Sequence, residues 1–191
     1  MAEAMIFIVT VGILIVVLLY VFNITWIAPE WIVIVLALLI APGIYAAFTS
    51  GPFVPSARQR HKRMLKLADL SKKDVVYDLG CGDGRLVFSA SKLAKKAVGY
   101  DLSIPLVLYG KCLSLFYPKA HIRFGNLWKQ DYSDATVIFC YLLPNAMKQF
   151  HRDVWPKLKK GTRVISNAFE IHEVKPKEKK ELSRYTFSLK L

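Results

Sequence analysis

Apolar and charged positions divide the chain into two unlike parts. Glu30 is the only charged residue between Ala4 and Ala57, and two apolar runs, Met5–Phe22 and Trp31–Phe48, fill most of that stretch. A helix of about 20 apolar residues, rising about 1.5 Å per residue, can cross a hydrocarbon layer of about 30 Å. The pattern therefore predicts a hairpin of two transmembrane helices, at about residues 5–26 and 31–48, with a turn at Ala28–Glu30.

Two other interpretations of the apolar part stay open. One is a cleaved signal peptide, although such a peptide would have a basic start and a shorter apolar run than this chain has. A single span followed by an interfacial helix kinked at Pro42–Gly43 would also fit, because proline is tolerated in membrane helices.

The flanking charges predict an orientation. Five cations, from Arg58 to Lys66, follow the second run closely, whereas the turn carries only Glu30. Positive residues stay on the cytoplasmic side, so we expect a multi-pass protein of the cell membrane whose second part is cytoplasmic and meets the lipid bilayer. The chain has no Arg-rich presequence, which indicates a prokaryotic source.

Beyond residue 70, short apolar strands alternate with helices. This order predicts an α/β fold with a mostly parallel, Rossmann-like sheet. Residues 1–50 would form the anchor, 51–70 a linker with a basic helix at Arg58–Leu70, and 71–191 the α/β domain. The expected strands are Val75–Leu79, Ala97–Leu102, Ile122–Phe124, Ala135–Leu142, Arg163–Phe169 and Arg184–Leu191. The expected helices are Gly84–Ala94, Pro105–Phe116 and Asn145–Leu158, while Lys175–Glu181 reads as a solvated loop or short helix.

Charge and cysteine content bear on which partners and metal ions the chain could bind. All 27 Lys and Arg lie from Arg58 onward with 12 of the 14 acidic residues, a net charge of +15 for this part. A basic face suits nucleic acid or anionic lipid, but is more often simply solvated. The three cysteines and four histidines show no metal-ligand spacing, so we expect no metal site.

One segment predicts a cofactor site. The strand Val75–Leu79 runs into Gly80-Cys81-Gly82-Asp83-Gly84 and then into a helix. Such glycines permit positive φ and close approach of a ligand to the backbone. The spacing is G-x-G-x-G, and Arg85 stands where a dinucleotide site has its third glycine. Asp78 suits a cationic amino group, and Asp101, at the tip of the next strand, suits ribose hydroxyls.

These residues resemble the first motif of class I S-adenosylmethionine-dependent methyltransferases, in Asp78–Gly84, and their ribose-binding acid, in Asp101. The resemblance implies S-adenosyl-L-methionine as cofactor, with S-adenosyl-L-homocysteine as product. It also implies that Asn126, after the third strand, lies by the adenine. The implied cofactor-binding set is Asp78, Gly80, Cys81, Gly82, Gly84, Asp101, Leu102, Asn126 and Leu127.

A narrower resemblance covers roughly Gly51–Phe169. The D/N-P-P-aromatic motif of many N-methyltransferases is absent after the fourth strand. The chain is more similar to the membrane-anchored protein-lysine methyltransferases that modify the ATP synthase c subunit and the adenine nucleotide translocator. The shared features are Gly51–Pro55, Arg85, Val98-Gly99-Tyr100, Asn126-Leu127-Trp128-Lys129 and Pro144. Unlike this chain, the mitochondrial members have one span and a longer C-terminal part.

The resemblance implies methylation of a lysine in an integral membrane protein by in-line transfer to a neutral amine. Our candidates for the substrate end are Phe53, Tyr141 and Asn145, although Phe53 could instead anchor in the membrane interface and Tyr141 could be a core residue. A lipid or small-molecule methyltransferase is an alternative. An RNA methyltransferase is a further one, although a membrane anchor argues against nucleic acid as a partner. A catalytically silent membrane scaffold is the last.

Overall fold

The computed structural model describes residues 30–49, 58–167, 169, 174, 178–180 and 186–190. The chain divides into two compact units, Met1–Ala41 and Pro42–Leu191. Helix α2 (Glu30–Thr49) has nearly the bounds predicted for the second apolar run, and it continues through Pro42. Among the described residues, no helix is long and apolar enough to cross a membrane. The second predicted span is thus found as a helix but not supported as a span, and the first, at 5–26, lies outside the described residues.

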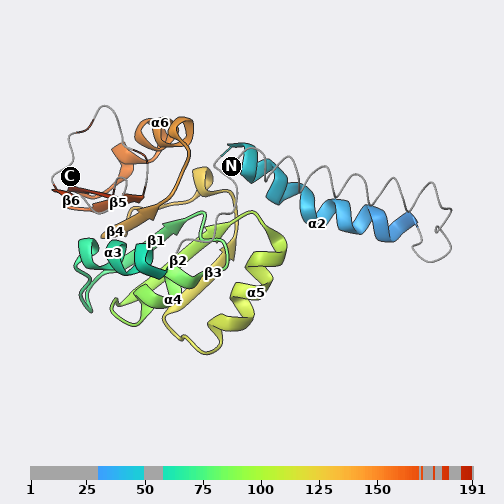
Figure 1. The fold of residues 1–191 in the computed structure, drawn as a ribbon, viewed down its shortest axis with the longest axis horizontal. Coiled ribbons are helices and arrows are strands. Elements are labelled where there is room, and N and C mark those ends of the chain that lie inside the picture. Colours follow the sequence, from blue (N-terminus) through green and yellow to red (C-terminus); the bar gives the residue numbers. More distant parts are fainter. Residues whose placement is uncertain are drawn as a thin grey trace. The chain divides into compact units, whose positions relative to one another are not determined.

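The second unit is built on one seven-stranded sheet (Figure 1). Its strands lie in the order β3-β2-β1-β4-β5-β7-β6. The first five pair in parallel, while β7 runs antiparallel to both β5 and β6. The strands are β1 (Val75–Leu79), β2 (Lys96–Asp101), β3 (Ala120–Phe124), β4 (Val137–Cys140), β5 (Arg163–Asn167), β6 (Glu178–Lys180) and β7 (Thr186–Lys190). This confirms the predicted Rossmann-like sheet.

Side chains of the parallel strands alternate between two apolar cores, one on each face of the sheet. Val76 and Phe139 point into one core, and Tyr77 and Ile138 into the other. Helices α3 (Arg58–Ala68) and α4 (Arg85–Ser91) contribute to the first core, as does α5 (Ile104–Ser114), whereas α6 (Pro144–Asp153) contributes to the second. Both faces of the parallel part are therefore covered, which explains why its strands read as nearly continuous apolar runs.

Several predicted bounds differ from the observed ones, and two of these differences have a structural cause. The segment Lys175–Glu181 was expected to be a solvated loop or short helix, but Glu178–Lys180 is strand β6, paired with β7. The helix expected over Asn145–Leu158 ends at Asp153 and gives way to the short helix η3 (Trp155–Lys157). Pro156 lacks the N–H that a longer α-helix would need there.

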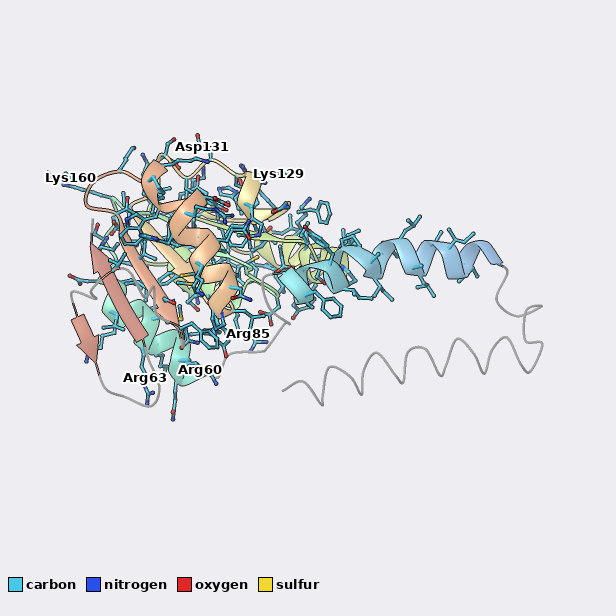
Figure 2. All side chains as sticks on the ribbon, turned by 90° about the horizontal axis from the view of Figure 1, so that it is seen from above. Arg60, Arg63, Arg85, Lys129, Asp131 and Lys160 are labelled. Carbon is cyan, nitrogen blue, oxygen red and sulfur yellow. The ribbon has the colours of Figure 1, made fainter. Side chains whose placement is uncertain are left out.

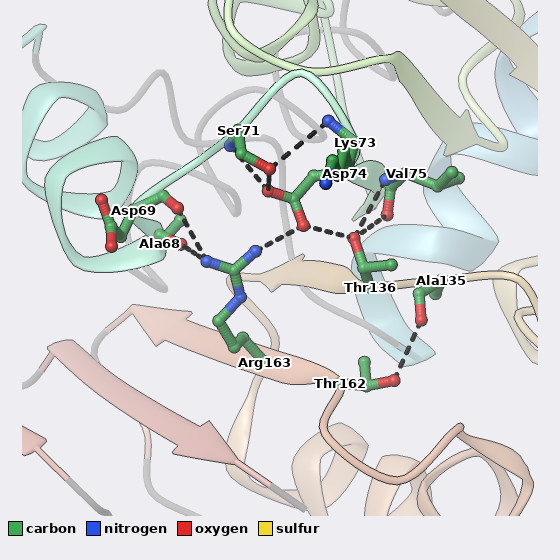
Figure 3. A network of polar contacts seen from close by, with 10 residues as sticks. All are labelled: Ala68, Asp69, Ser71, Lys73, Asp74, Val75, Ala135, Thr136, Thr162 and Arg163. Atoms are coloured by element: carbon green, nitrogen blue, oxygen red, sulfur yellow. Dashed lines mark hydrogen bonds and ion pairs between the residues drawn. The ribbon is translucent and has the colours of Figure 1, made fainter.

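A polar network fastens the amino-terminal ends of β1, β4 and β5 to the end of α3 (Figure 3). The Arg163 guanidinium donates to the carbonyls of Ala68 and Asp69, where α3 ends, and to the carboxylate of Asp74. Asp74 also accepts from the Thr136 hydroxyl at 2.7 Å. Burial alone would raise the pKa of Asp74, but these hydrogen bonds, that of Arg163 first, lower it to about 2. The network lies at the opposite ends of the strands from the predicted cofactor turn.

Strand order also indicates where a ligand crevice is expected. From β1 the chain proceeds to β2 and β3 on one side, then crosses to β4 on the other. Loops after the carboxyl ends of β1 and β4 therefore diverge, and parallel α/β sheets bind ligands at such a switch point. The Gly-rich turn follows β1, and Tyr141 follows β4.

Candidate active site

Glycines shape the turn that leaves β1. Gly80, Gly82 and Gly84 have φ of 77°, 56° and 79°, values that a side chain disfavours. The amides of Gly80 and Cys81 both donate to the carbonyl of Tyr100, at 2.9 and 3.1 Å. The turn is thereby held against the end of β2, and the three positive φ values are those that the glycines were predicted to permit.

Gly99 of β2 makes room for this turn. A Cβ on Gly99 would lie 2.6 Å from both Cβ and Sγ of Cys81, and 2.8 Å from Cγ2 of Val87. The Cys81 thiol is buried there, and burial raises its pKa well above the ordinary value. Cys81 therefore acts as a packing residue beneath the turn, and its contact with the cofactor stays a prediction.

Asp101 is oriented by the turn that it faces. Its Oδ2 accepts from the Gly82 amide at 2.8 Å, and its Oδ1 accepts from the Ser103 amide at 2.8 Å. The side chain is only partly buried, so each oxygen keeps lone-pair capacity for a ligand hydroxyl. Both oxygens are thus fixed in advance, which suits recognition of the two hydroxyls of a ribose.

Asp78 makes the turn a site for a cation. It is only 7% exposed, and burial followed by repulsion from Asp101 and Asp83 raises its pKa to about 7. In the described part of the chain no cation forms an ion pair with Asp78, whereas Asp83 is paired with Arg85. A ligand that brings a positive amino group to Asp78 and hydroxyls to Asp101 would satisfy both acids. S-adenosyl-L-methionine carries both, so the residues fit the expected cofactor.

Asn126 and Leu127 have structural roles as well as predicted ones. Asn126 caps the short helix η2 (Leu127–Lys129), and its Oδ1 accepts from the Trp128 amide at 2.9 Å. The Leu127 side chain is buried in the second core, and its carbonyl accepts from the Tyr132 hydroxyl at 2.7 Å. Leu102 directly follows Asp101 and is half-buried. Contacts of these three residues with the cofactor stay predictions.

The structure describes two of the three predicted substrate residues. Tyr141 follows β4 and is half-buried, and Asn145 is exposed in the first turn of α6. Both therefore lie at the carboxyl edge of the sheet, beside the crevice. Phe53 lies outside the described residues. Within the described ranges, no three His, Cys, Asp or Glu side chains gather as a candidate metal site.

The sequence did not predict that α3 brings a side chain to the carboxyl edge of the sheet. Arg60 donates to the Tyr141 hydroxyl at 3.5 Å, and its guanidinium carbon lies 5.9 Å from the centre of that ring. The pKa of His61 is lowered by burial first and then by the charge of Arg85, which places His61 near the Gly-rich turn. Figure 2 shows Arg60 and Arg85 on the same side of the domain. The sequence had marked Arg60 only as one member of a basic cluster, because 81 positions separate it from Tyr141.

Asn167 is a second residue without a sequence signal. It ends β5 and follows Ser166, the register partner of Cys140, so it lies beside the connection from β4 to α6. Its Nδ2 is buried, and among the described residues it has no hydrogen-bond partner. A buried donor of this kind is uncommon.

Comparisons with known proteins agree with this geometry. The model of the ANTKMT methyltransferase domain matches residues 78–178. A protein-lysine N-methyltransferase of Saccharolobus islandicus (strain REY15A) is 40% identical over 132 residues, 66% of this chain and 82% of the relative. The lysine N-methyltransferase of the ATP synthase c subunit from Xenopus laevis is 33% identical over 121 residues, 62% of this chain and 53% of the relative.

A solved structure is also similar. An RNA methyltransferase from Salinibacter ruber, in complex with S-adenosyl-L-homocysteine, superposes with a TM-score of 0.68 at 32% identity, over 72% of this chain and 93% of that one. The fold and the acidic Gly-rich turn thus define an S-adenosylmethionine-dependent methyltransferase. Within that class, the chain belongs to the family of the ANTKMT methyltransferase domain, among relatives that are protein-lysine N-methyltransferases. It spans about half the length of the Xenopus relative.

Proposed function

We propose that this enzyme methylates the side-chain amine of a lysine in a membrane protein. The observation that carries the lysine assignment is the 40% identity with the Saccharolobus protein-lysine N-methyltransferase, 82% of which the match covers. The similarity to the enzyme that methylates the ATP synthase c subunit in Xenopus supports a substrate of the same kind.

The residues of the crevice suit this chemistry. When bound, the cofactor supplies an electrophilic methyl group, and the acceptor must offer a neutral amine although the ordinary pKa of lysine is about 10.4. The Arg60 guanidinium beside Tyr141 disfavours a second positive charge there, which lowers the pKa of an arriving amine. The Tyr141 hydroxyl and the Asn145 amide oxygen can accept N–H bonds from that amine and direct its lone pair toward the crevice. Asp78, Gly82 and Asp101 hold the cofactor.

Membrane association is the second half of the proposal. Large apolar side chains of α2, among them Ile34, Leu38 and Phe48, are exposed. An apolar surface of this size needs a partner, and a lipid bilayer would cover it. Cations following α2 in the sequence would favour the anionic cytoplasmic face of the cell membrane. A membrane-held substrate would then meet the enzyme at high effective concentration.

Labelled native membranes test the substrate. The full chain is incubated with them and methyl-labelled cofactor, beside Asp101→Ala as a site variant and Asp131→Asn as a matched change of an exposed carboxylate. We expect protein-bound label that resists nuclease and maps to methyl-lysine by mass spectrometry, is lost with Asp101→Ala, and persists with Asp131→Asn. Label in extracted lipid would instead identify a lipid methyltransferase.

An RNA substrate is the second candidate. Its specific support is the likeness to the Salinibacter RNA methyltransferase, together with the excess of cations from Arg58 onward. In the same experiment, label that disappears on nuclease treatment would favour this candidate over lysine.

A further inference from the structure

Helix α5 presents an apolar face to solvent. Val107 and Gly110 lie on its buried side, where Gly110 packs against Ile122 of β3. On the other side Leu108 and Tyr109 are each 56% exposed, and beyond the helix end Leu115 is 81% and Phe116 79% exposed. Together with the exposed Pro105 and Cys112, they form what we call the α5 face: Pro105, Leu108, Tyr109, Cys112, Leu115 and Phe116.

The spacing shows that this face is continuous. Within α5, spacings of three or four positions join Pro105 to Leu108 and Tyr109, and these two to Cys112, which is the repeat of one helix face. Leu115 and Phe116 follow directly beyond the helix end. A surface helix of a water-soluble protein normally carries polar residues on its outer side. Here the polar residues of α5 are only Lys111 and Ser114. Contiguous exposed apolar residues of this kind mark an interaction surface.

The charged residues in the segment that carries the α5 face are all positive. No acidic residue occurs between Asp101 and Asp131, a stretch that contains Lys111, Lys119, Arg123 and Lys129. Lys92 adds a fifth cation, since its Nζ lies 5.4 Å from the ring centre of Tyr117, just beyond the end of α5. Lys92, Lys111 and Lys119 are all exposed. The charged residues of α5 and of the segment that follows it are thus all cations.

We propose that the α5 face docks on the surface of an anionic phospholipid bilayer. Leu108, Tyr109 and Phe116 would enter the interface, while Lys111 and Lys119 would meet the headgroups. Exposed aromatic and aliphatic residues beside Lys are the composition by which helices lie in a membrane interface. This surface belongs to the methyltransferase domain itself, so the inference does not depend on the N-terminal segment or on the identity of the methyl acceptor.

A second copy of the chain fits the surface less well. A two-fold contact through the α5 face would place the same patch of both copies together. Lys111 and Lys119 would then face cations of the partner without an acidic residue of the face to offset them. Anionic lipid removes this repulsion, and a protein dimer increases it.

The chain offers its own probe site. Cys112 is exposed on the α5 face, whereas Cys81 and Cys140 are buried. The full chain is labelled at Cys112 with an environment-sensitive fluorophore and mixed with vesicles of phosphatidylcholine alone or with about one-third phosphatidylglycerol. In the control protein the probe is moved to Lys160→Cys in a Cys112→Ser background. Lys160 is an exposed residue just before β5, at one edge of the parallel part of the sheet, whereas α5 joins β2 and β3 at the opposite edge.

We expect the Cys112 probe to shift to the blue and brighten about twofold or more on anionic vesicles, with quenching by lipids brominated in the acyl chain. Neutral vesicles should give a smaller change, and the Lys160 position none. Phe116→Ser and Lys119→Glu should each reduce the change several-fold, whereas Lys160→Glu, the same change of charge elsewhere, should not. Unchanged cofactor binding would show that these variants are folded.

Two results would overturn the proposal. One is a Cys112 probe that still reports water when sedimentation shows the protein bound to anionic vesicles, since another part of the chain would then make the contact. The other is a probe shift that occurs without vesicles and grows with protein concentration, which would assign the α5 face to self-association. Both results are independent of methyl transfer, so a failure here leaves the proposed lysine activity standing.

Discussion

Replacing Asp78 with Asn should stabilise the protein while weakening cofactor binding. Asp78 is buried at the end of β1, and the charges of Asp101 and Asp83 both oppose its ionisation. In the unfolded chain the same carboxyl is solvated and ionises at its ordinary pKa. Asparagine has nearly the same shape and never carries the charge. The variant therefore isolates the cost of ionising this one carboxylate.

The magnitude follows from the pKa. It rises from 3.8 to about 7 in the folded protein, and each unit corresponds to about 1.4 kcal/mol. Because the folded state holds the proton more tightly than the unfolded state, the free energy of unfolding falls as pH rises from about 4 to about 7. Above that range the ionised group costs at most about 4 kcal/mol. The advantage of Asp78→Asn should grow over the same range and then level off.

Denaturant unfolding of both proteins at pH 5 and pH 8 measures this difference, with Asp131→Asn as an exposed control that should show no such growth. Calorimetry with S-adenosyl-L-methionine measures the second predicted effect, the loss of affinity for the cofactor. Binding to the native chain should strengthen as pH rises toward about 7, because the carboxylate is the form that attracts a cation. The variant should bind at least about tenfold more weakly. If Asp78→Asn were destabilised equally at both pH values, the electrostatic account of this site would be wrong.

Three further predictions concern the framework of the site. Asp101→Ala should weaken cofactor binding in calorimetry by about 1.5–3 kcal/mol for each charge-assisted hydrogen bond lost, and unchanged affinity would remove Asp101 from the site. Gly99→Ala should lower the free energy of unfolding by about 1–3 kcal/mol through overlap with Cys81, and full stability would show that the turn can move aside. Arg163→Met should cost about 2–4 kcal/mol because it strands a buried carboxylate. Arg152→Met, which breaks an exposed pair, should change stability much less than Arg163→Met, and equal losses would contradict the role of burial.

The parallel sheet was predictable because each strand carries its own signal. The bounds of β1 agree with the sequence prediction, and β2 and β5 begin or end within two residues of it. Both faces of these strands are covered, so apolar content alone marks them. Strand β6 carries no such signal, since Glu-Lys-Lys reads as solvated and becomes a strand only by pairing with β7.

The cofactor half of the site was predictable for a related reason. Asp78, Gly82 and Asp101 lie at the ends of adjacent strands, and the order of strands in a βαβ unit brings them together. The other half depends on tertiary contacts. Arg60 reaches Tyr141 across 81 positions, and no local pattern distinguishes it from Arg63 or Lys66 in the same helix. Likewise, the packing of Cys81 beneath the turn becomes visible only through its contact distance with Gly99.

The two halves of the crevice differ in charge, and that difference has a chemical consequence. Asp78, Asp83 and Asp101 make the expected cofactor end acidic, while Arg60 brings a guanidinium to the proposed acceptor end at Tyr141. The acidic end thus repels an anion beside Asp78, and the guanidinium of Arg60 repels an ammonium group beside Tyr141. Because α3 supplies Arg60 and is held at its other end by Arg163, the network at the base of the sheet also sets the position of the acceptor end. Loss of Arg163 should therefore affect turnover of the acceptor more than affinity for the cofactor, whose expected ligands lie at the ends of β1 and β2.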